Sequence, residues 1–151
     1  MDSDMGAVGK SVSKANAREL VRGKAVYTAD MRLPGLVYAR TRRSERAHAL
    51  IRKIEAVRAE AVEGVLLVLT ARDIPGENRM GIINLDQPLL AEDRVRYRGD
   101  NLALVVGDKS AVEEALGLIE VLYEPLPLVL DAERALEAGA PELREARVFD
   151  V

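Results

Sequence analysis

The chain has 151 residues, a formal net charge of −3, 48% hydrophobic residues and only 3% aromatic residues. This length favours one domain, and an acidic balance with few aromatic rings argues against a nucleic-acid-binding surface. The sequence has no cysteine, which excludes disulfides, thiol nucleophiles and thiolate-bound iron–sulfur clusters, and without an apolar run near about 18 residues we expect no membrane span and a cytoplasmic setting.

The first part of the chain is predicted to hold a polar arm followed by strands. We expect residues 1–18 to form a loose arm, because they are polar and carry no periodic apolar pattern. Lys24–Thr28 and Leu36–Arg43 are predicted strands on either side of a turn at Leu33-Pro34-Gly35. A further short strand is predicted over Leu50–Ile54.

The middle of the chain alternates between helix and strand signals. A helix is predicted over Glu55–Glu63, with Gly64 placed to end it. Val65–Leu69 is an unbroken apolar run, which is typical of a buried strand covered on both faces. Thr70 and Asp73 have the spacing of an N-terminal cap for a single helical turn.

The clearest local signal is a strand–helix–strand unit in the second half of the chain. Leu102–Val106 is a continuous apolar block and is predicted to be a buried strand. Ser110 and Glu113 have the spacing of a capping box, so we expect a helix to begin at Ser110. That helix has an apolar stripe at helical spacing, made of Val112, Ala115, Leu116 and Ile119. A second extended segment, Glu120–Glu124, ends at two prolines.

The remaining segments complete an α+β pattern. A long loop is expected over Gly76–Glu92, and Asp131 is placed to cap a last helix that ends at Ala138. We expect the globular domain to cover residues 19–140 and residues 141–151 to be a linker or truncated end. Several strands are adjacent and no Gly-x-Gly-x-x-Gly follows a strand, so we predict a mixed sheet with packed helices rather than a doubly wound fold.

One histidine and one arginine cluster are the first candidates for chemistry. His48 has no clustered carboxylates around it and no paired nucleophile, which favours a structural role over a metal ligand or general base. The arginine cluster would suit a phosphate or an acidic partner, but a solvated face that pairs with Glu45 and Glu55 is the favoured interpretation. The cluster consists of Arg40, Arg42, Arg43 and Arg46.

The other candidates also favour structural interpretations. The carboxylates in and after the predicted helix alternate with apolar residues, as on an ordinary exposed face; they are Glu113, Glu114, Glu120 and Glu124. Gly9-Lys10-Ser11 matches only the end of a phosphate-binding loop, because Asp4 stands where the pattern needs glycine. Arg98-Gly99-Asp100 spells an adhesion tripeptide, but a turn before the buried strand is the favoured interpretation. We therefore predict no catalytic, cofactor-binding or metal-binding residue in this chain.

An ordered series of short motifs resembles one known domain. The series contains Leu33-Pro34-Gly35-Leu36-Val37-Tyr38-Ala39, Arg43-Ser44 with Ala47-His48-Ala49, Val95-Arg96-Tyr97, and Tyr123-Glu124-Pro125-Leu126-Pro127. It is similar to the N-terminal α/β-hammerhead domain of the molybdopterin-binding large subunit in the xanthine dehydrogenase and aldehyde oxidase family. Two places depart from the family pattern: Glu45-Arg46 replaces the usual Pro-His, and Asp100-Asn101 replaces the usual Glu-Pro.

The resemblance implies a role for the chain as part of a larger enzyme. The parent enzyme would hydroxylate a purine, an aldehyde or a related substrate oxidatively, using molybdopterin held by segments outside this sequence. Its partners would be the molybdopterin-binding domain of the same large subunit and the iron–sulfur and flavin subunits, with no nucleic acid or membrane. We expect the isolated chain to be inactive and to self-associate. The alternative is a stand-alone binding or assembly module with the hammerhead fold.

Overall fold

The computed structural model describes residues 9–141, and the chain divides into two units, with the boundary in the sequence between Leu36 and Val37. The described part of the first unit contains helix α1 (Ala17–Val21) and the short 3-10 turn η1 (Thr28–Asp30), and none of its residues is buried. The domain boundaries expected from the sequence, at residues 19 and 140, remain predictions.

The strand predicted over Lys24–Thr28 is wrong. A strand needs a hydrogen-bonded neighbour, and within residues 9–36 no second strand is available. Instead the Tyr27 backbone N–H donates to the Asp30 carboxylate at 3.0 Å, which stabilises η1. The turn predicted at Leu33-Pro34-Gly35 is confirmed, since the Leu36 N–H donates to the Leu33 carbonyl at 3.1 Å.

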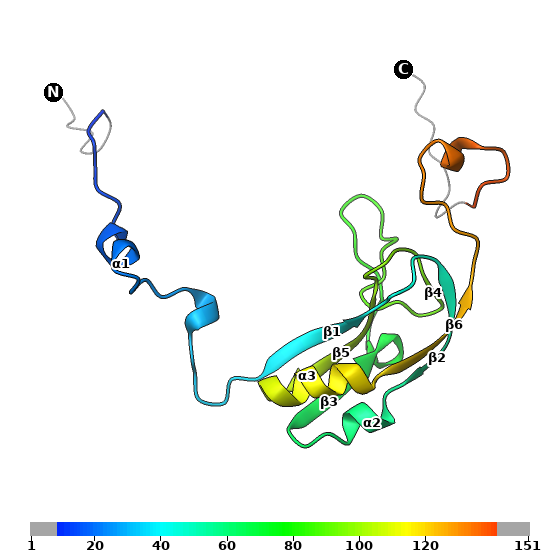
Figure 1. Cartoon of the computed structure of the whole chain (residues 1–151), viewed down its shortest axis with the longest axis horizontal. Helices are drawn as coiled ribbons and strands as arrows, with labels where there is room; N and C mark the ends of the chain where they lie inside the picture. Colours follow the sequence, from blue (N-terminus) through cyan, green and yellow to red (C-terminus); the bar gives the residue numbers. More distant parts are fainter. Residues whose placement is uncertain (1–8, 142–151) are drawn as a thin grey trace. The chain divides into compact units, whose positions relative to one another are not determined.

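The second unit contains two three-stranded sheets (Figure 1). The first sheet has the order β1–β5–β3, with bounds Tyr38–Arg43, Asn101–Gly107 and Val65–Thr70. The second sheet has the order β4–β2–β6, with bounds Arg94–Val95, Ala49–Glu55 and Glu120–Pro125. The α+β class is confirmed. The expectation of a mixed sheet is wrong, because each central strand runs antiparallel to both of its neighbours.

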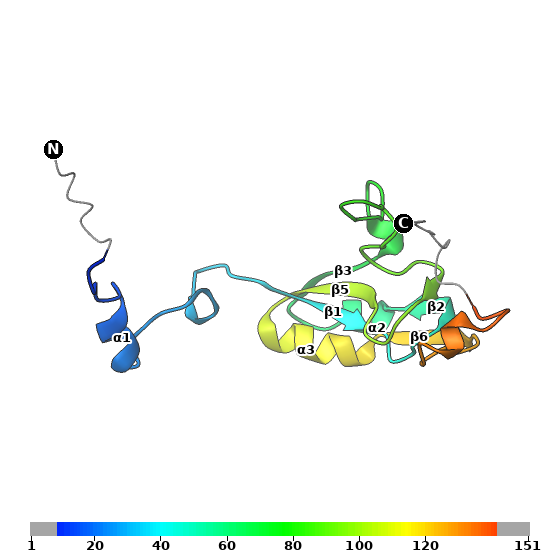
Figure 2. The same ribbon diagram turned by 90° about the horizontal axis from the view of Figure 1, so that it is seen from above.

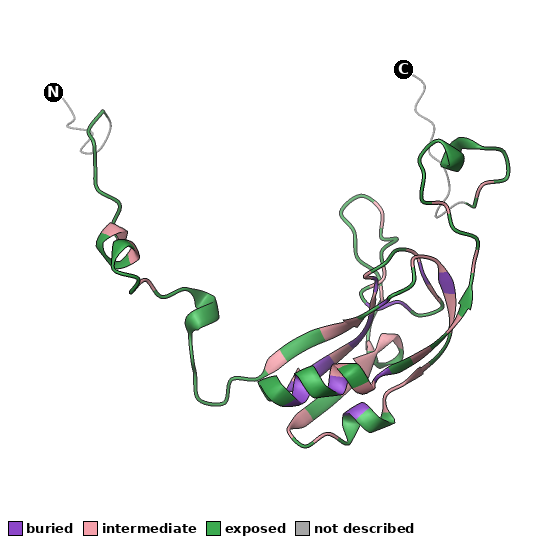
Figure 3. Cartoon of the chain, viewed as in Figure 1, coloured by how far each residue is buried: buried purple, intermediate pink, exposed green. Residues whose placement is uncertain are grey.

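Helix α3 (Lys109–Leu118) builds the main core with strand β5. Val112, Ala115 and Ile119 are buried against Ala103 and Val105, so the predicted apolar stripe is confirmed. The short helix α2 (Val57–Glu60) joins the same cluster through one fully buried alanine, Ala59. Figure 3 shows buried segments on β5, on α3 and on α2.

A second core cluster links the two sheets. Leu102 of β5 packs with Ala49 of β2, Val95 of β4 and Ala91, and all four side chains are fully buried. Ala91 lies near the end of the long loop, which is present as predicted and is held by the Asn78 side chain. That side chain donates to the Leu90 carbonyl at 2.7 Å and accepts from the Leu90 N–H at 3.1 Å.

The burial predicted for Val65–Leu69 is wrong on one face of the strand. β3 lies at the edge of its sheet, and only the side that faces α3 joins the core. Leu66 is 65% exposed and Leu67 is 42% exposed. Leu104 in the central strand is likewise only half-buried, whereas Leu102 on the same strand is fully buried.

The capping motifs had mixed outcomes. The Thr70–Asp73 cap is confirmed and precedes the 3-10 turn η2 (Ala71–Asp73). The capping box at Ser110 is wrong, because α3 begins one residue earlier, after Asp108. Asp131 does accept backbone hydrogen bonds, but the helix after it is a single 3-10 turn, η3 (Arg134–Leu136).

Two further predictions concern segment ends. The helix predicted over Glu55–Glu63 is shorter than expected, because α2 ends at Glu60 with Ala61 as its C-cap residue. Gly64 therefore does not end the helix as predicted; its positive φ of +91° lies in the turn directly before β3. Of the predicted linker, only Pro141 lies inside the described residues, and 142–151 lie outside them.

Candidate functional site

The best-ordered polar site joins the end of β1 to the turn before β5. The backbone N–H of Ser44 donates to the Asp100 carbonyl at 2.8 Å, and the Gly99 N–H donates to the Ser44 carbonyl at 2.9 Å. The Ser44 hydroxyl donates to the Arg46 carbonyl at 2.9 Å and accepts from the Arg46 N–H at 3.0 Å. Ser44 is 3% exposed. Its hydroxyl therefore holds a turn and is not presented as a nucleophile.

Asp100 has a structural role at the same junction. Its side chain is 3% exposed and accepts a hydrogen bond from the Arg96 backbone N–H at 3.1 Å. Gly99 has a φ of +99°, a left-handed conformation that favours glycine. Arg98-Gly99-Asp100 is thus a turn before the buried strand, as predicted, and its carboxylate faces the protein.

The two departures from the family pattern meet at this junction. Glu45 and Arg46 follow Ser44, while Asn101 follows Asp100 and pairs with Arg43 across β1 and β5. Sequence reasoning treated the departures as separate changes, because the two pairs are distant in the chain and only the strand pairing brings them together.

His48 connects the start of β2 to the chain that leaves β6. Its Nδ1 lies 2.8 Å from the Pro127 carbonyl, and its own carbonyl accepts from the Leu126 N–H at 3.2 Å. Its Nε2 is buried without a hydrogen-bond partner among the described residues. This contact supports the predicted structural role, since one ring nitrogen bonds a backbone carbonyl.

A hollow of about 360 Å³ lies beside His48. Its lining is mostly apolar and includes no serine, threonine or cysteine; it consists of Ala47, His48, Arg96, Tyr97, Arg98, Pro127, Leu128, Val129, Leu130, Ala135 and Pro141. The hollow offers His48 no serine, threonine or cysteine nucleophile to activate. Sequence reasoning missed it, because its lining comes from three segments that are distant in the chain and meet only in the folded structure.

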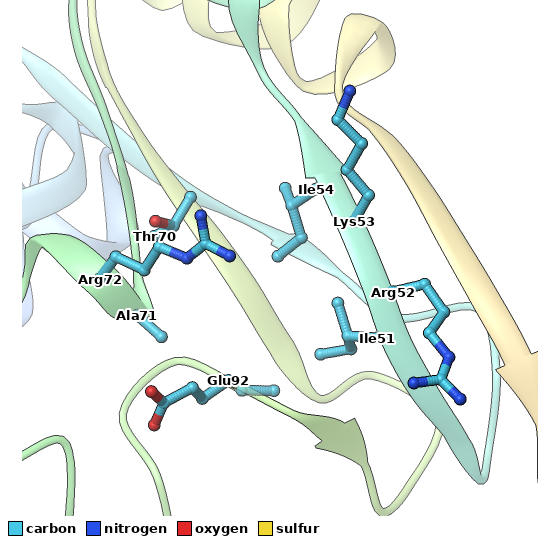
Figure 4. A pocket seen from close by; sticks show the side chains of 9 residues that line it. Ile51, Arg52, Lys53, Ile54, Thr70, Ala71, Arg72 and Glu92 are labelled. Atoms are coloured by element: carbon cyan, nitrogen blue, oxygen red, sulfur yellow. The ribbon is translucent and has the colours of Figure 1, made fainter.

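A second hollow, of about 170 Å³, lies between β2 and η2 (Figure 4). Ile51 and Ile54 point into it from β2, whereas Arg52 and Lys53 point away. The charged residues on its lining are Arg52, Lys53, Arg72 and Glu92. This volume is below the roughly 300 Å³ typical of ligand pockets, so we assign no ligand to it.

Two members of the arginine cluster, Arg40 and Arg42, form ion pairs. Arg42 pairs with Glu45 at 3.1 Å, as predicted, and Arg40 pairs with Glu113 of α3 at 3.6 Å. The expected pairing with Glu55 is wrong, because Glu55 pairs with Lys53, its neighbour two residues away on β2. Arg43 donates to the Thr41 hydroxyl at 3.4 Å.

The other candidate carboxylates are also exposed and paired. Glu120 pairs with Arg58 at 3.2 Å, and Glu124 accepts from Arg52 at 2.6 Å. Glu114 is exposed, and Gly9-Lys10-Ser11 lies on an exposed segment of the first unit. Within the second unit, the partners of Glu120 and Glu124 are arginines, and neither carboxylate is paired with His48.

One carboxyl group has a clearly perturbed acidity. The Thr70 backbone N–H and hydroxyl donate to Asp73 at 2.7 and 2.9 Å, which lowers the pKa of Asp73 below its ordinary 3.8. Between residues 9 and 141, no group of three or more histidine, aspartate and glutamate residues is arranged to hold a metal ion. None of the helices in the same range has the length and hydropathy needed to cross a membrane.

Comparison with known proteins identifies relatives for most of the chain. The family described as "Aldehyde oxidase and xanthine dehydrogenase, a/b hammerhead domain" matches residues 22–127. The chain is 41% identical over 133 residues to a probable xanthine dehydrogenase subunit of Bacillus subtilis, called the Bacillus relative below. It is 40% identical over 144 residues to the nicotinate dehydrogenase large molybdopterin subunit of Eubacterium barkeri. These alignments cover 87% and 95% of this chain but only 18% and 34% of the relatives.

Solved structures agree with the sequence comparison. The Cu,Mo-CO dehydrogenase structure matches 91% of this chain with a TM-score of 0.82 and 36% identity, and the match covers 18% of that protein's chain. The aldehyde oxidoreductase of Desulfovibrio gigas matches 85% of this chain with a TM-score of 0.77 and 27% identity, and the match covers 16% of that protein's chain. The chain therefore spans less than a fifth of these two structures.

Proposed function

Because the chain belongs to the a/b hammerhead domain family of aldehyde oxidases and xanthine dehydrogenases, we propose that it serves as the structural hammerhead domain of a molybdenum hydroxylase large subunit. The observation that carries the proposal is the family match over residues 22–127, which includes every strand of both sheets. The parent enzyme would hydroxylate a purine, an aldehyde or a related substrate oxidatively. The resemblance seen in the sequence is confirmed by this match.

The described residues do not fit a molybdenum or iron–sulfur centre. The sequence has no thiolate, and the Ser44 hydroxyl and one ring nitrogen of His48 contact backbone groups of the domain itself. The Asp100 carboxylate likewise accepts from the backbone. We therefore derive no catalytic step through this chain, and we propose that molybdopterin is held by other parts of the large subunit.

The proposed partners follow from the same role. They are the molybdopterin-binding domain of the same large subunit and, in the complete enzyme, iron–sulfur and flavin subunits. Oxidative hydroxylation needs a metal to activate water and a path for electrons, and side chains alone cannot accept two electrons. The isolated chain is therefore expected to show no turnover of its own.

Two measurements test the proposal. The purified chain is assayed for molybdenum and for dye reduction with purines and aldehydes, and we expect neither stoichiometric metal nor turnover. The chain is then co-expressed with a truncated Bacillus relative, from which the matched 133-residue segment has been deleted. Co-purification with this truncated relative supports the domain role. Turnover by the chain alone that vanishes in His48→Ala, or failure to co-purify, would contradict it.

A further inference from the structure

The sheet β1–β5–β3 has an apolar set of residues on the face away from α3. In antiparallel pairs, residues directly opposite each other lie on the same face. Val106 pairs with Leu67 of β3 and Ala39 of β1, and Leu104 pairs with Leu69 and Thr41. We call these six residues the open face; they are Ala39, Thr41, Leu67, Leu69, Leu104 and Val106.

Helices α2 and α3 of this unit cover the opposite face. Ala103 and Val105 alternate with the open-face residues along β5, and they are buried against α3 together with Ala59 of α2. Figure 2 shows α3 on one side of the sheet and the long loop rising on the other. The open face is therefore not covered by the helices that build the core.

The open face is partly exposed, and none of its residues carries a charge. Leu67 is 42% exposed, Ala39 is exposed, and the four remaining residues are only half-buried. The loop on the same side has an apolar, exposed tip, with Ile82 fully exposed and Ile83 at 87%. Antiparallel sheets with one solvated face usually alternate apolar and polar residues, and β5 lacks that alternation because it is apolar on both faces.

The sheet edges differ in how they are protected. β1 carries Arg40, Arg42 and Arg43, and β6 carries two glutamates in ion pairs and ends at Pro125. Charged residues and proline commonly prevent an exposed edge strand from pairing with a strand of another chain. β3 has the sequence VLLVLT, which contains no charged residue and no proline. The strand that contributes Leu67 and Leu69 to the open face is therefore an edge strand without this protection.

We propose that the open face is the surface on which the rest of the large subunit packs, through an uncharged, mainly apolar face of its own. This inference rests on the proposed function. The relatives are several times longer, with this chain matching 18% of the Bacillus relative, so most of the large subunit is available to cover the open face. A permanent contact within one polypeptide favours apolar, uncharged surfaces of this kind.

The test compares two single lysine substitutions in the co-expression with the truncated Bacillus relative. Leu67→Lys places a charge on the open face, where packing would have to desolvate it. Leu122→Lys is the matched control, because Leu122 lies on β6 of the other sheet and is 62% exposed. We expect Leu67→Lys to weaken binding about tenfold or more and Leu122→Lys to leave it within about twofold.

The outcomes separate this inference from the proposed function. If the unmodified chain binds the truncated relative and Leu67→Lys binds equally well, the open face is not the contact surface, while the domain role stands. If the unmodified chain does not bind, both fail. A Leu67-dependent dimer of the chain without binding to the truncated relative would assign the face to a second copy and overturn the inference.

If the truncated relative is insoluble, a chimera provides a second test. The chain replaces the matched segment of the complete Bacillus relative, and backbone hydrogen exchange is measured over Val65–Thr70. We expect Leu67→Lys to raise exchange there and Leu122→Lys to leave it unchanged. Equal exchange in the two chimeras would contradict the inference.

Discussion

Leu102 and Leu104 lie two residues apart on β5 and point to the same face of the sheet, yet their surroundings differ. Leu102 is fully buried between Ala49, Ala91 and Val95, where the two sheets meet. Leu104 belongs to the open face and is half-buried. The continuous apolar block in the sequence predicted both as buried, because a run of apolar residues does not reveal where a covering layer ends.

The first prediction compares these two leucines. Leu102→Ala should cost about 2–5 kcal/mol of unfolding free energy, because it removes buried methyl groups and leaves a cavity. Leu104→Ala should cost less than half of that, since its side chain already contacts solvent. Urea unfolding of both variants, fitted with a common m value, measures the difference in unfolding free energy. Equal losses of unfolding free energy would contradict the prediction that only Leu102 is fully buried.

Among the secondary-structure elements, capping motifs of similar sequence had different outcomes for a tertiary reason. Thr70 and Asp73 form their cap from groups three residues apart, and no distant residue competes. Glu113 pairs with Arg40 of β1 instead of capping α3, and the Asp108 N–H that precedes this helix donates to the Gly64 carbonyl at 2.9 Å. Local spacing predicts a cap reliably only when no residue from a distant strand competes for the same side chain.

The second prediction concerns the Thr70–Asp73 cap and pH. Since the folded pKa of Asp73 lies below the ordinary 3.8, its carboxylate stabilises the fold fully above that value and loses this effect as pH falls through the lower folded pKa. Wild type should exceed Asp73→Ala in melting temperature near neutral pH, and the difference should shrink below 3.8.

The control for this prediction is Asp108→Ala. Asp108 precedes α3, but its side chain makes no capping hydrogen bond. Near neutral pH, the melting temperature of Asp108→Ala should differ less from that of the wild type than the melting temperature of Asp73→Ala does. An Asp73→Ala difference that stays constant to the lowest pH would contradict the role of the ionised carboxylate.

The third prediction compares two glycines at the ends of neighbouring elements. A Cβ on Gly107, the last residue of β5, would lie 2.3 Å from the Gly64 carbonyl oxygen, whereas a Cβ on Gly117 of α3 would meet nothing within 4 Å. Gly107→Ala should therefore destabilise by about 3 kcal/mol, and Gly117→Ala should stabilise by about 0.5–1 kcal/mol. Thermal and urea unfolding check both signs, and an unchanged Gly107→Ala variant would refute the close approach of β5 and β3.

For the whole molecule, the sequence predicted the class and the family more accurately than the sheet arrangement. Strand existence followed from apolar runs such as Leu102–Val106, and the ordered motifs indicated the hammerhead domain. The division into two sheets was not predictable, because β1 and β2 are adjacent in sequence but pair with β5 and β6. No structured site was predicted, and the Ser44–Asp100 junction was missed because its two halves are distant in the chain.

The fourth prediction concerns the isolated chain. With the open face and the loop tip at Ile82 and Ile83 uncovered, the chain should self-associate as its concentration rises. Sedimentation velocity over a concentration series measures this, with Leu67→Lys expected to reduce the association and Leu122→Lys serving as the control. A strictly monomeric wild type at the highest concentration would contradict the expectation.

The strand pairing also has a consequence for how the chain is synthesised. Arg43 of β1 pairs with Asn101, and Ala49 of β2 pairs with Pro125. At a synthesis rate of roughly 5–20 residues per second, about 3–12 s pass between the synthesis of Arg43 in β1 and that of its partner Asn101 in β5. During that interval the hydrogen-bonding groups and apolar side chains of β1 have no native strand partner, and such non-local pairing is intrinsically slow. The arginines of β1 therefore also act during synthesis, because their charge disfavours pairing with a wrong strand until β5 has been made.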